Sequence, residues 1–418
     1  MTVPERRGRL VVVLGALTAV APLTIDAYVP GFPELTRSLH TGPAEVQLSM
    51  TAFLVGLAAG QILLGPVSDG LGRRRVILAG VAAYTVLSVA CALAPGITVL
   101  VGARFLAGVA AAAGVVVARA VVTDRFQGRD IPRTFSLLSV ILGVAPVAAP
   151  VLGGLILAVS SWRAIFVVQA GVGLLLLATA AAWVPESLPP ERRQRGGLST
   201  TFRAMGALAA RREVLGYVLV TAFTGAALFT YIAGATFVFQ DGYHVSTTGY
   251  SLVFATNATG MLLASALFGA LAARVRVNTL LTAAVSGSAL ASAALVAVLL
   301  AGGGGLAVTW SLLVVALAGI GVMLPASMTI GQVLGRRSAG AASALMGGLQ
   351  FLFGAVASPL VGAIGAASAL PMAVIMAGAL GAAVLALLCL ARPWQGHGEP
   401  HLTSRGTLAT TAAPAGTG

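Results

Sequence analysis

The chain has 418 residues, of which 58% are hydrophobic and only 9% are charged, and its mean hydropathy is +0.97. Soluble domains carry roughly 25% charged residues, and a soluble core of this size could not absorb so much apolar surface. The net charge of +13 comes from arginines in short blocks between apolar runs, without interleaved aromatic residues, which excludes a nucleic-acid-binding patch. The composition therefore predicts a protein embedded in a lipid bilayer.

The apolar runs are long enough to cross a bilayer as helices. Two of them cover residues 165–184 and 372–391, and about twenty residues are needed to span the hydrocarbon core. Lipid admits only helices and closed barrels, and barrel strands alternate apolar and polar residues in segments of about ten. Because these runs are unbroken, the fold class predicted is an all-α integral membrane protein.

Taken in chain order, the runs and the loop residues between them predict twelve membrane-spanning helices. The first six are expected at about 10–30, 47–67, 76–94, 97–118, 135–158 and 164–184. The second six are expected at about 214–238, 248–271, 278–300, 306–330, 341–364 and 369–391. The first run follows three arginines, as in a signal peptide, but it is long and ends in prolines instead of a small-residue cleavage pattern. An uncleaved first helix is predicted.

One long polar stretch divides the predicted helices into two sets of six. The expected domains are an N-terminal six-helix bundle at 1–184, a cytoplasmic linker at 185–213 and a C-terminal six-helix bundle at 214–391. The tail at 392–418 is small, polar and rich in Ala, Thr and Gly, which favours disorder.

The arginines also orient the predicted helices. Arginine blocks follow helices 2, 4, 6, 8, 10 and 12, whereas only Arg37 and Arg163 fall on the other side. Cytoplasmic loops carry the excess of positive charge in membrane proteins. We therefore expect a multi-pass protein of the bacterial cytoplasmic (inner) membrane with both termini in the cytoplasm.

Two strongly charged residues remain inside the predicted spans, Asp26 in helix 1 and Arg104 in helix 4. A helical rise of about 1.5 Å per residue places both charges at similar depth towards the outer side. They could pair, or share a wet cavity, if the two helices are neighbours. A charge at the bilayer centre costs roughly 2.5–3.5 kcal/mol and usually marks a pathway. The alternatives are a capping residue for Asp26 and a snorkelling side chain for Arg104.

Uncharged polar and aromatic residues in the spans are weaker candidates for lining a substrate cavity: Tyr28, Gln61, Tyr231, Asn257, Gln350 and Phe353. Polar side chains in such helices can equally hydrogen-bond to a neighbouring helix. The two cysteines, Cys91 and Cys389, lie in apolar runs and indicate neither a disulfide framework nor a metal site.

Helix 5 combines proline with glycine in the series Gly143, Pro146, Pro150, Gly153 and Gly154. Proline removes an intrahelical hydrogen bond and kinks the helix, and glycine lets a second helix approach closely. A bent and smooth helix suits a bundle that rocks, although tight packing alone is the simpler explanation. A similar glycine and proline series in helix 11, about 200 residues later, hints at an internal repeat.

The loop after helix 2 has the most specific pattern, with Gly65, Asp69, Gly72, Arg73 and Arg74. Glycine permits the tight turn between antiparallel helices. The carboxylate of Asp69 can accept hydrogen bonds from a helix N-terminus or pair with arginine. A cluster that only oriented the chain would need the arginines but not this spacing of Gly65, Asp69 and Gly72.

These features resemble the major facilitator superfamily. The loop after helix 2 looks like its G-x-x-x-D-x-x-G-R-R signature, and Arg104 looks like the arginine of its helix 4 motif. The helix 5 series is similar to the antiporter motif, with Ala145-Pro146 where Gly-Pro is usual. The segment 22–30 resembles helix 1 of the twelve-span drug:proton antiporters, most of all the bicyclomycin-resistance (Bcr/CflA) subfamily.

The resemblance implies secondary active transport by alternating access, with two six-helix bundles rocking around a central site. Asp26 would take a proton from outside as a drug leaves, Arg104 would bias its ionisation, and the charges around Asp69 and Arg73 would hold the cytoplasmic side closed in the outward-open state. It further implies a monomer that carries small amphipathic molecules, with protons as coupling ions and no cofactor.

Two other functions remain open at this point. The same fold could export a small endogenous metabolite, a sugar or a self-made antibiotic. A membrane enzyme or sensor is the remote alternative, because the chain has no metal-ligand spacing, no lysine for a phosphate-binding loop and no soluble catalytic domain. We therefore expect no enzymatic activity and no catalytic or metal-ligating residues.

Overall fold

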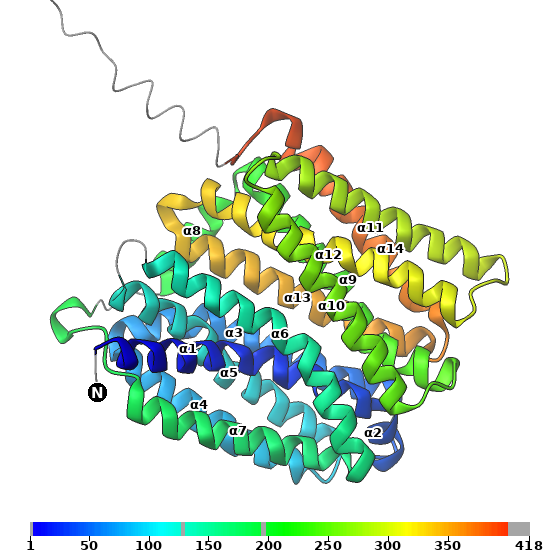
Figure 1. Cartoon of the computed structure of the whole chain (residues 1–418), viewed down its shortest axis with the longest axis horizontal. Coiled ribbons are helices and arrows are strands. Elements are labelled where there is room, and N and C mark those ends of the chain that lie inside the picture. The colour runs from blue at the N-terminus through cyan, green and yellow to red at the C-terminus, as the bar shows by residue number, and fades with distance from the viewer. Residues whose placement is uncertain (1–2, 127–129, 194–197, 400–418) are drawn as a thin grey trace, which may run out of the picture.

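A computed structural model describes residues 3–126, 130–193 and 198–399. Across these residues every regular element is helical, and twelve helices are long and apolar enough to cross a membrane (Figure 1). The predicted fold class, with its twelve spans, is confirmed.

Seven helices form the N-terminal half: α1 Val3–Asp26, α2 Phe32–Ser38, α3 Pro43–Leu71, α4 Arg73–Ala92, α5 Ile97–Arg125, α6 Asp130–Val159 and α7 Trp162–Trp183. A 3-10 turn, η1 Val29–Gly31, joins α1 to α2, so the first span runs on as far as Ser38. Gly72 alone separates α3 from α4. Its φ of +97° is a left-handed value, which suits glycine.

Six further long helices form the C-terminal half: α9 Arg212–Phe237, α10 Thr247–Leu271, α11 Val277–Leu300, α12 Leu306–Leu334, α13 Ala339–Gly365 and α14 Ala369–Leu385. Short π-helical segments, Val238–Gly242 and Ala386–Ala391, extend α9 and α14. Most helix ends lie within a few residues of the predicted ones because apolar runs and loop residues mark them directly.

The two halves repeat one packing pattern. In the N-terminal half α1 packs on α6, α3 on α5, and α4 on α7. In the C-terminal half α9 packs on α13, α10 on α12, and α11 on α14, which is the same set of contacts moved along the chain. The structure therefore contains the internal repeat that the glycine and proline series of helices 5 and 11 suggested.

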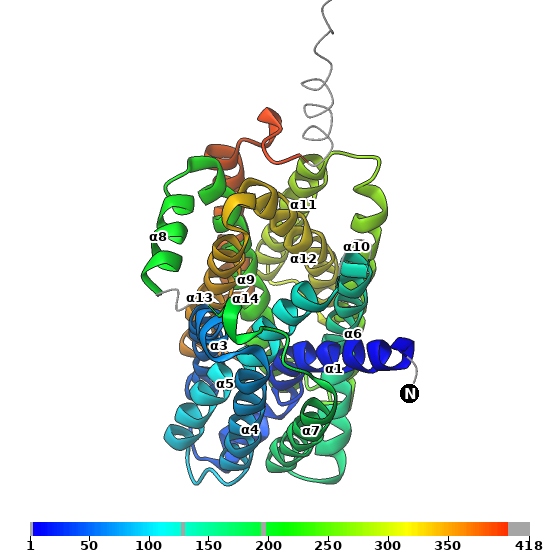
Figure 2. The same cartoon turned by 90° about the vertical axis from the view of Figure 1, so that its left-hand side faces the viewer.

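The halves meet along two helix pairs, α3 with α13 and α6 with α10, and the turn η1 also contacts α9 and α10. In Figure 2 helices α11 and α12 of the C-terminal half lie above α4, α5 and α7 of the N-terminal half. We call the end of the bundle that holds Gly72 and Arg125 the basic end. The end that holds Ser38 and Gly42 is the far end.

Two segments at the basic end have structure that was not predicted. The linker at 185–213 contains the helix α8 Leu198–Ala209, whose buried Leu208 packs in an apolar cluster with α9 and α13. The tail, expected to be disordered from 392, is ordered as far as Glu399. The buried carboxylate of Glu399 accepts hydrogen bonds from the backbone N–H groups of Val277 and Asn278 and thereby caps α11. The rest of the tail, 400–418, lies outside the described residues.

Candidate functional site

Asp26 is the last residue of α1, and it lies at the junction of the two halves. Only 3% of it is exposed, and its Oδ1 atom has no hydrogen-bond partner among the described residues. The neighbouring turn η1 contacts α9 and α10, and Asp26 is close enough to Tyr231 and Tyr250 on those helices to act on both electrostatically. The buried carboxyl therefore faces the C-terminal half.

Arg104 lies inside the N-terminal half and is 1% exposed, so it is not a snorkelling side chain. Its guanidinium carbon is 4.3 Å from the ring centres of both Tyr28 and Phe53, an arrangement that stabilises a buried cation through the faces of the rings. One guanidinium nitrogen donates to the carbonyl of Thr24 at 3.5 Å, and Nε has no partner among the described residues.

The structure does not pair Asp26 with Arg104, although α1 and α5 are neighbours as the proposed pairing required. Within α1, the Thr24 side chain bonds to the Tyr84 hydroxyl of α4 and therefore faces the N-terminal half. Asp26 is two residues further along the same helix, and side chains two residues apart do not share a side, so Asp26 leaves the helix on the other side. The helical rise predicted equal depth for the two charges, and depth does not specify direction around the helix axis.

Tyr231 and Asn257 belong to a hydrogen-bonded chain in the C-terminal half. The indole N–H of Trp310 donates to Oδ1 of Asn257 at 3.1 Å, and Nδ2 of Asn257 donates to the hydroxyl oxygen of Tyr231 at 2.7 Å. The ring of Tyr231 stacks on Phe254 with 5.6 Å between centres. These contacts link α12, α10 and α9.

The remaining candidates for a substrate cavity have other neighbours in the described structure. Tyr28 covers Arg104 and bonds to Ser49 through its hydroxyl. Gln61 packs against Gly347 of α13, and Gln350 packs on Gly225 of α9. Phe353 meets Phe223 edge to face at 5.2 Å. The six predicted residues thus fall into separate contact groups instead of converging on one point.

The glycines of the helix 5 motif are at the closest contacts of α6. A Cβ atom on Gly153 would collide with the backbone carbonyl of Ala27, and one on Gly154 would collide with the side chain of Ser251 on α10. A Cβ on Gly143 would lie 2.5 Å from Leu262, also on α10. Pro146 and Pro150 both lie inside the continuous helix. The motif therefore forms the surface where α6 meets the opposite half and the residue next to Asp26.

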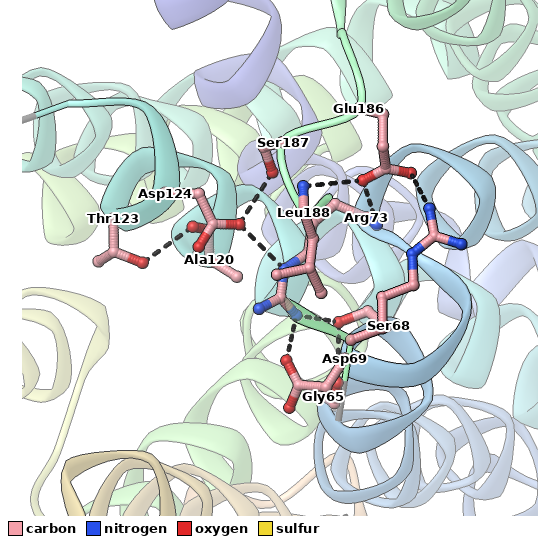
Figure 3. Close-up of polar contacts among 11 residues, drawn as sticks. Gly65, Ser68, Asp69, Arg73, Ala120, Thr123, Asp124, Glu186, Ser187 and Leu188 are labelled. Atoms are coloured by element: carbon pink, nitrogen blue, oxygen red, sulfur yellow. Dashed lines mark hydrogen bonds and ion pairs between the residues drawn. The ribbon is translucent and has the colours of Figure 1, made fainter. Parts of the chain in front are cut away.

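The motif after helix 2 is centred on Arg73, as Figure 3 shows. The Arg73 guanidinium forms ion pairs with Asp69 at 2.6 Å and Asp124 at 3.2 Å, and it donates to the hydroxyl of Ser68. Its backbone N–H donates to Glu186 at 2.9 Å. Arg74 donates to the carbonyls of Val184 and Ala181 at the end of α7.

Asp124 and Glu186 were not among the predicted site residues, although both take part in this cluster. Glu186 also accepts from the backbone N–H of Leu188, and its other oxygen is 3.7 Å from Arg193 in the linker. The signal in the sequence was an acidic residue after each of predicted helices 4 and 6, in segments that also carry arginines. Asp69 is 47% exposed, and its ion pair is with Arg73 in its own half. The cluster thus joins α3, α4, α5 and the linker, and the bonds named here lie within the N-terminal half and the linker.

Three residues near the far end form hydrogen bonds between the halves, and we call these bonds the far-end links. Gln47 of α3 donates to the carbonyl of Ala233 and accepts from the N–H of Gly362. Thr51 donates to the carbonyl of Ala355. The third link runs from the Gln240 side chain to the carbonyl of Pro30. Gln47 was not predicted, because its partners are backbone groups about 190 and 315 residues away.

Comparison with known proteins places this geometry in a family. The model of the Major Facilitator Superfamily matches residues 14–359. The MFS-type transporter YdgK of Bacillus subtilis (strain 168) is 39% identical over 374 residues, which cover 89% of this chain and 92% of that protein. A bicyclomycin resistance protein homolog of Haemophilus influenzae is 29% identical over 90% of this chain and 94% of its own. A chloramphenicol resistance protein of Pseudomonas aeruginosa is 33% identical over 62% of this chain and 61% of its own.

Solved structures share the fold. The nucleoside transporter NupG superimposes with a TM-score of 0.74 at 14% identity, covering 91% of this chain and 99% of its own. The xylose transporter XylE from E. coli gives a TM-score of 0.70 at 15% identity over 91% of this chain and 96% of its own. The twelve apolar helices and the bacterial relatives indicate a multi-pass protein of the inner membrane. The chain belongs to the Major Facilitator Superfamily and is a membrane transporter, not an enzyme.

Proposed function

We propose that this transporter exports drugs or other small amphipathic molecules in exchange for protons, by alternating access. The observation that carries the proposal is Asp26, a carboxyl buried at the junction of the two halves with an acceptor atom that no described residue satisfies. An acidic group at this depth is costly in a membrane and marks an ion or proton pathway. The names of relatives that confer resistance to bicyclomycin and chloramphenicol support export as the direction.

In this proposal the basic end faces the cytoplasm, as the distribution of arginines favours. The far-end links then close the outer side in the conformation described. Opening to the outside requires those links to break while the halves rock about α3–α13 and α6–α10. A carboxyl changes its protonation state when burial, charges or hydrogen bonds around it change. Asp26 lies where such rocking alters all three.

Arg104 does not act on Asp26 as a direct ion-pair partner in this proposal. It holds the segment that carries Asp26, through the carbonyl of Thr24 and the ring of Tyr28. A movement of this segment between conformations would therefore move Asp26 relative to the opposite half. Both residues remain our candidates for proton coupling, Asp26 as the proton carrier and Arg104 as the group that positions it.

Transport by purified protein in liposomes tests the function. Vesicles with an imposed proton gradient would be assayed with a panel of amphipathic antibiotics that includes chloramphenicol, using wild type, Asp26→Asn and the exposed-residue control Glu191→Gln. We expect gradient-driven transport in wild type and the control, and a loss of at least about tenfold in Asp26→Asn with an unchanged melting temperature, because one proton-carrying group is removed while the side-chain volume is kept. Full gradient-driven transport by Asp26→Asn would contradict the assignment. Proton-coupled exchange without antibiotic transport would instead point to an endogenous metabolite.

A further inference from the structure

Donor and acceptor chemistry gives the hydrogen-bonded chain in the C-terminal half a direction. An indole nitrogen can only donate, so the Trp310 bond identifies the accepting end of the Asn257 side chain as Oδ1. The opposite end of that amide, Nδ2, can only donate, and it donates to the Tyr231 hydroxyl oxygen at 2.7 Å. The order Trp310 to Asn257 to Tyr231 is therefore the order of donation.

The hydroxyl hydrogen of Tyr231 is free to donate elsewhere. Its oxygen already accepts from Asn257, and the described residues offer that hydrogen no acceptor within bonding distance. Only 2% of Tyr231 is exposed, so water does not freely satisfy the group, and a buried donor without a partner is costly. The stack on Phe254 restricts the ring, so the hydroxyl stays at one place at the junction.

Asp26 offers an acceptor at the same junction. Its Oδ1 atom is buried without a partner, and the turn that follows it packs on α9 and α10, the helices that carry Tyr231 and Asn257. The rings of Phe32, at the start of α2, and Phe237, at the end of α9, lie 6.0 Å apart. The segment that follows Asp26 therefore packs directly on the helix that carries Tyr231.

The charged and titratable groups around this end of α1 divide between its two sides. On the side of Asp26 are Tyr231 from α9 and Tyr250 from α10, which both sense its charge, while α6 contributes the bare backbone of Gly153. On the opposite side are Arg104 from α5 with Tyr84 and Cys91 from α4. Among the titratable groups, the two tyrosines are thus the candidates to donate a hydrogen bond to Asp26, and the Tyr231 hydroxyl is the one that accepts from the Asn257 amide.

We propose that Tyr231 is a positioning residue for Asp26. Its O–H, oriented by Trp310 through Asn257, donates a hydrogen bond to the Asp26 carboxylate when that group is charged and the two halves bring them within bonding distance, a contact that the described conformation does not contain. The inference rests on the proposed proton coupling and deepens it, because the bond runs from the C-terminal half to the proton carrier of the N-terminal half. Loss of the Asp26 charge weakens the bond, and the junction then opens more easily.

Infrared difference spectroscopy during a pH titration tests the contact without relying on transport. The carbonyl band of protonated Asp26 is identified as the band that Asp26→Asn removes. A hydrogen bond to a carboxylate favours the charged form, so Tyr231→Phe should move the midpoint of this band about one pH unit or more towards higher pH. Trp310→Phe and Asn257→Leu should move it in the same direction by less, since each leaves the Tyr231 hydroxyl in place without its orientation.

Tyr217→Phe is the matched control, since it removes a buried hydroxyl from the same helix α9 whose partner is Asn278. It should leave the midpoint unchanged, as should Tyr250→Phe. An unchanged midpoint in Tyr231→Phe, or an equal shift in Tyr217→Phe or Tyr250→Phe, overturns the proposal. The two proposals fail separately. If Tyr231→Phe shifts the band but transport does not depend on the gradient, the contact is retained and the transport mechanism is rejected. If transport is driven by the gradient but the band does not shift, the mechanism is retained and the contact is rejected.

Discussion

Arg73 contributes more bonds at the basic end than its place in a positively charged loop would suggest. Its side chain is mostly buried and pairs with two carboxylates from different helices, and its backbone N–H reaches a third. Arg75, two positions later, is exposed. Arg73 therefore holds helices together, whereas Arg75 of the same block contributes positive charge to the surface.

Replacing Arg73 by alanine should destabilise the protein by about 2 kcal/mol or more, because hydrogen bonds to charged groups contribute roughly 1.5–3 kcal/mol and the carboxylate of Asp124 would lose its ion-pair partner. Thermal unfolding in detergent measures the change. Arg75→Ala removes the same charge from the same block and should stay within about 0.5 kcal/mol of wild type. Equal losses in the two variants would mean that the net positive charge, and not the bonding of Arg73, stabilises this end.

The membrane-embedded charges show what sequence alone can predict at the residue scale. Counting residues gives the depth of Asp26 and Arg104, because every helical residue adds the same rise. It does not give their neighbours. Arg104 is enclosed by the rings of Tyr28, in the bend after α1, and Phe53 of α3, and the turn after Asp26 packs on α9 and α10 of the opposite half. Both environments therefore depend on helices far away in the chain.

The α6 helix has glycine where its contacts leave no space for a side chain. Gly153 packs on the backbone carbonyl of Ala27, the residue after Asp26, and so limits where the end of α1 lies. The sequence indicated a smooth helix at this place, but could not say which glycine met which partner. Gly102 of α5 provides the contrast, because it is exposed and a Cβ there would meet nothing within 4 Å.

Gly153→Ala should therefore destabilise the protein by about 1–3 kcal/mol, the usual cost of forcing an extra carbon into a packed contact. It should also reduce gradient-driven transport, because the end of α1 has to move. Gly102→Ala should instead raise the free energy of unfolding by up to about 1 kcal/mol, because alanine has the higher helix propensity. Thermal unfolding measures both changes. If Gly153→Ala is as stable and active as wild type, the contact does not constrain α1.

The positions of the membrane-spanning helices were predictable from the sequence. The defined structure of the segments that connect and follow them was not. Long apolar runs determine a span because no other backbone structure satisfies its polar groups in lipid. The α8 helix and the end of the tail are short, and their order comes from packing of Leu208 and capping by Glu399 against distant helices. Polar composition predicted a disordered tail, and tertiary contacts hold its first part as far as Glu399.

At the scale of the whole molecule, the conformation is held by bonds between the halves near the far end. Gln47 is fully buried, and both ends of its amide bind backbone groups of the C-terminal half. Alternating access requires these bonds to be broken and made in every cycle. Their energy therefore sets part of the balance between the two conformations.

Replacing Gln47 by leucine should favour opening at the far end by about tenfold or more, because two hydrogen bonds of about 1 kcal/mol each are lost. Electron-spin distance measurements between labels at the exposed Ser38 and Ser368, in a background without Cys91 and Cys389, should gain a longer component. Gln169→Leu is the control, since Gln169 is a buried glutamine within the N-terminal half whose amide has no partner among the described residues. An unchanged distance distribution in Gln47→Leu would show that other contacts hold this end closed.

By itself the sequence determined the class of the protein, its twelve spans, the two-fold repeat and the signature after helix 2. Each of these depends on local hydrophobicity or on residues adjacent in the chain, which lipid and backbone geometry constrain strongly. Only the tertiary structure decided that Asp26 faces the opposite half while Arg104 is enclosed in its own, and that Gln47 closes the far end. Those choices depend on the rotation of each helix about its axis and on the partners that packing brings to it. Residue spacing along one helix does not contain that information.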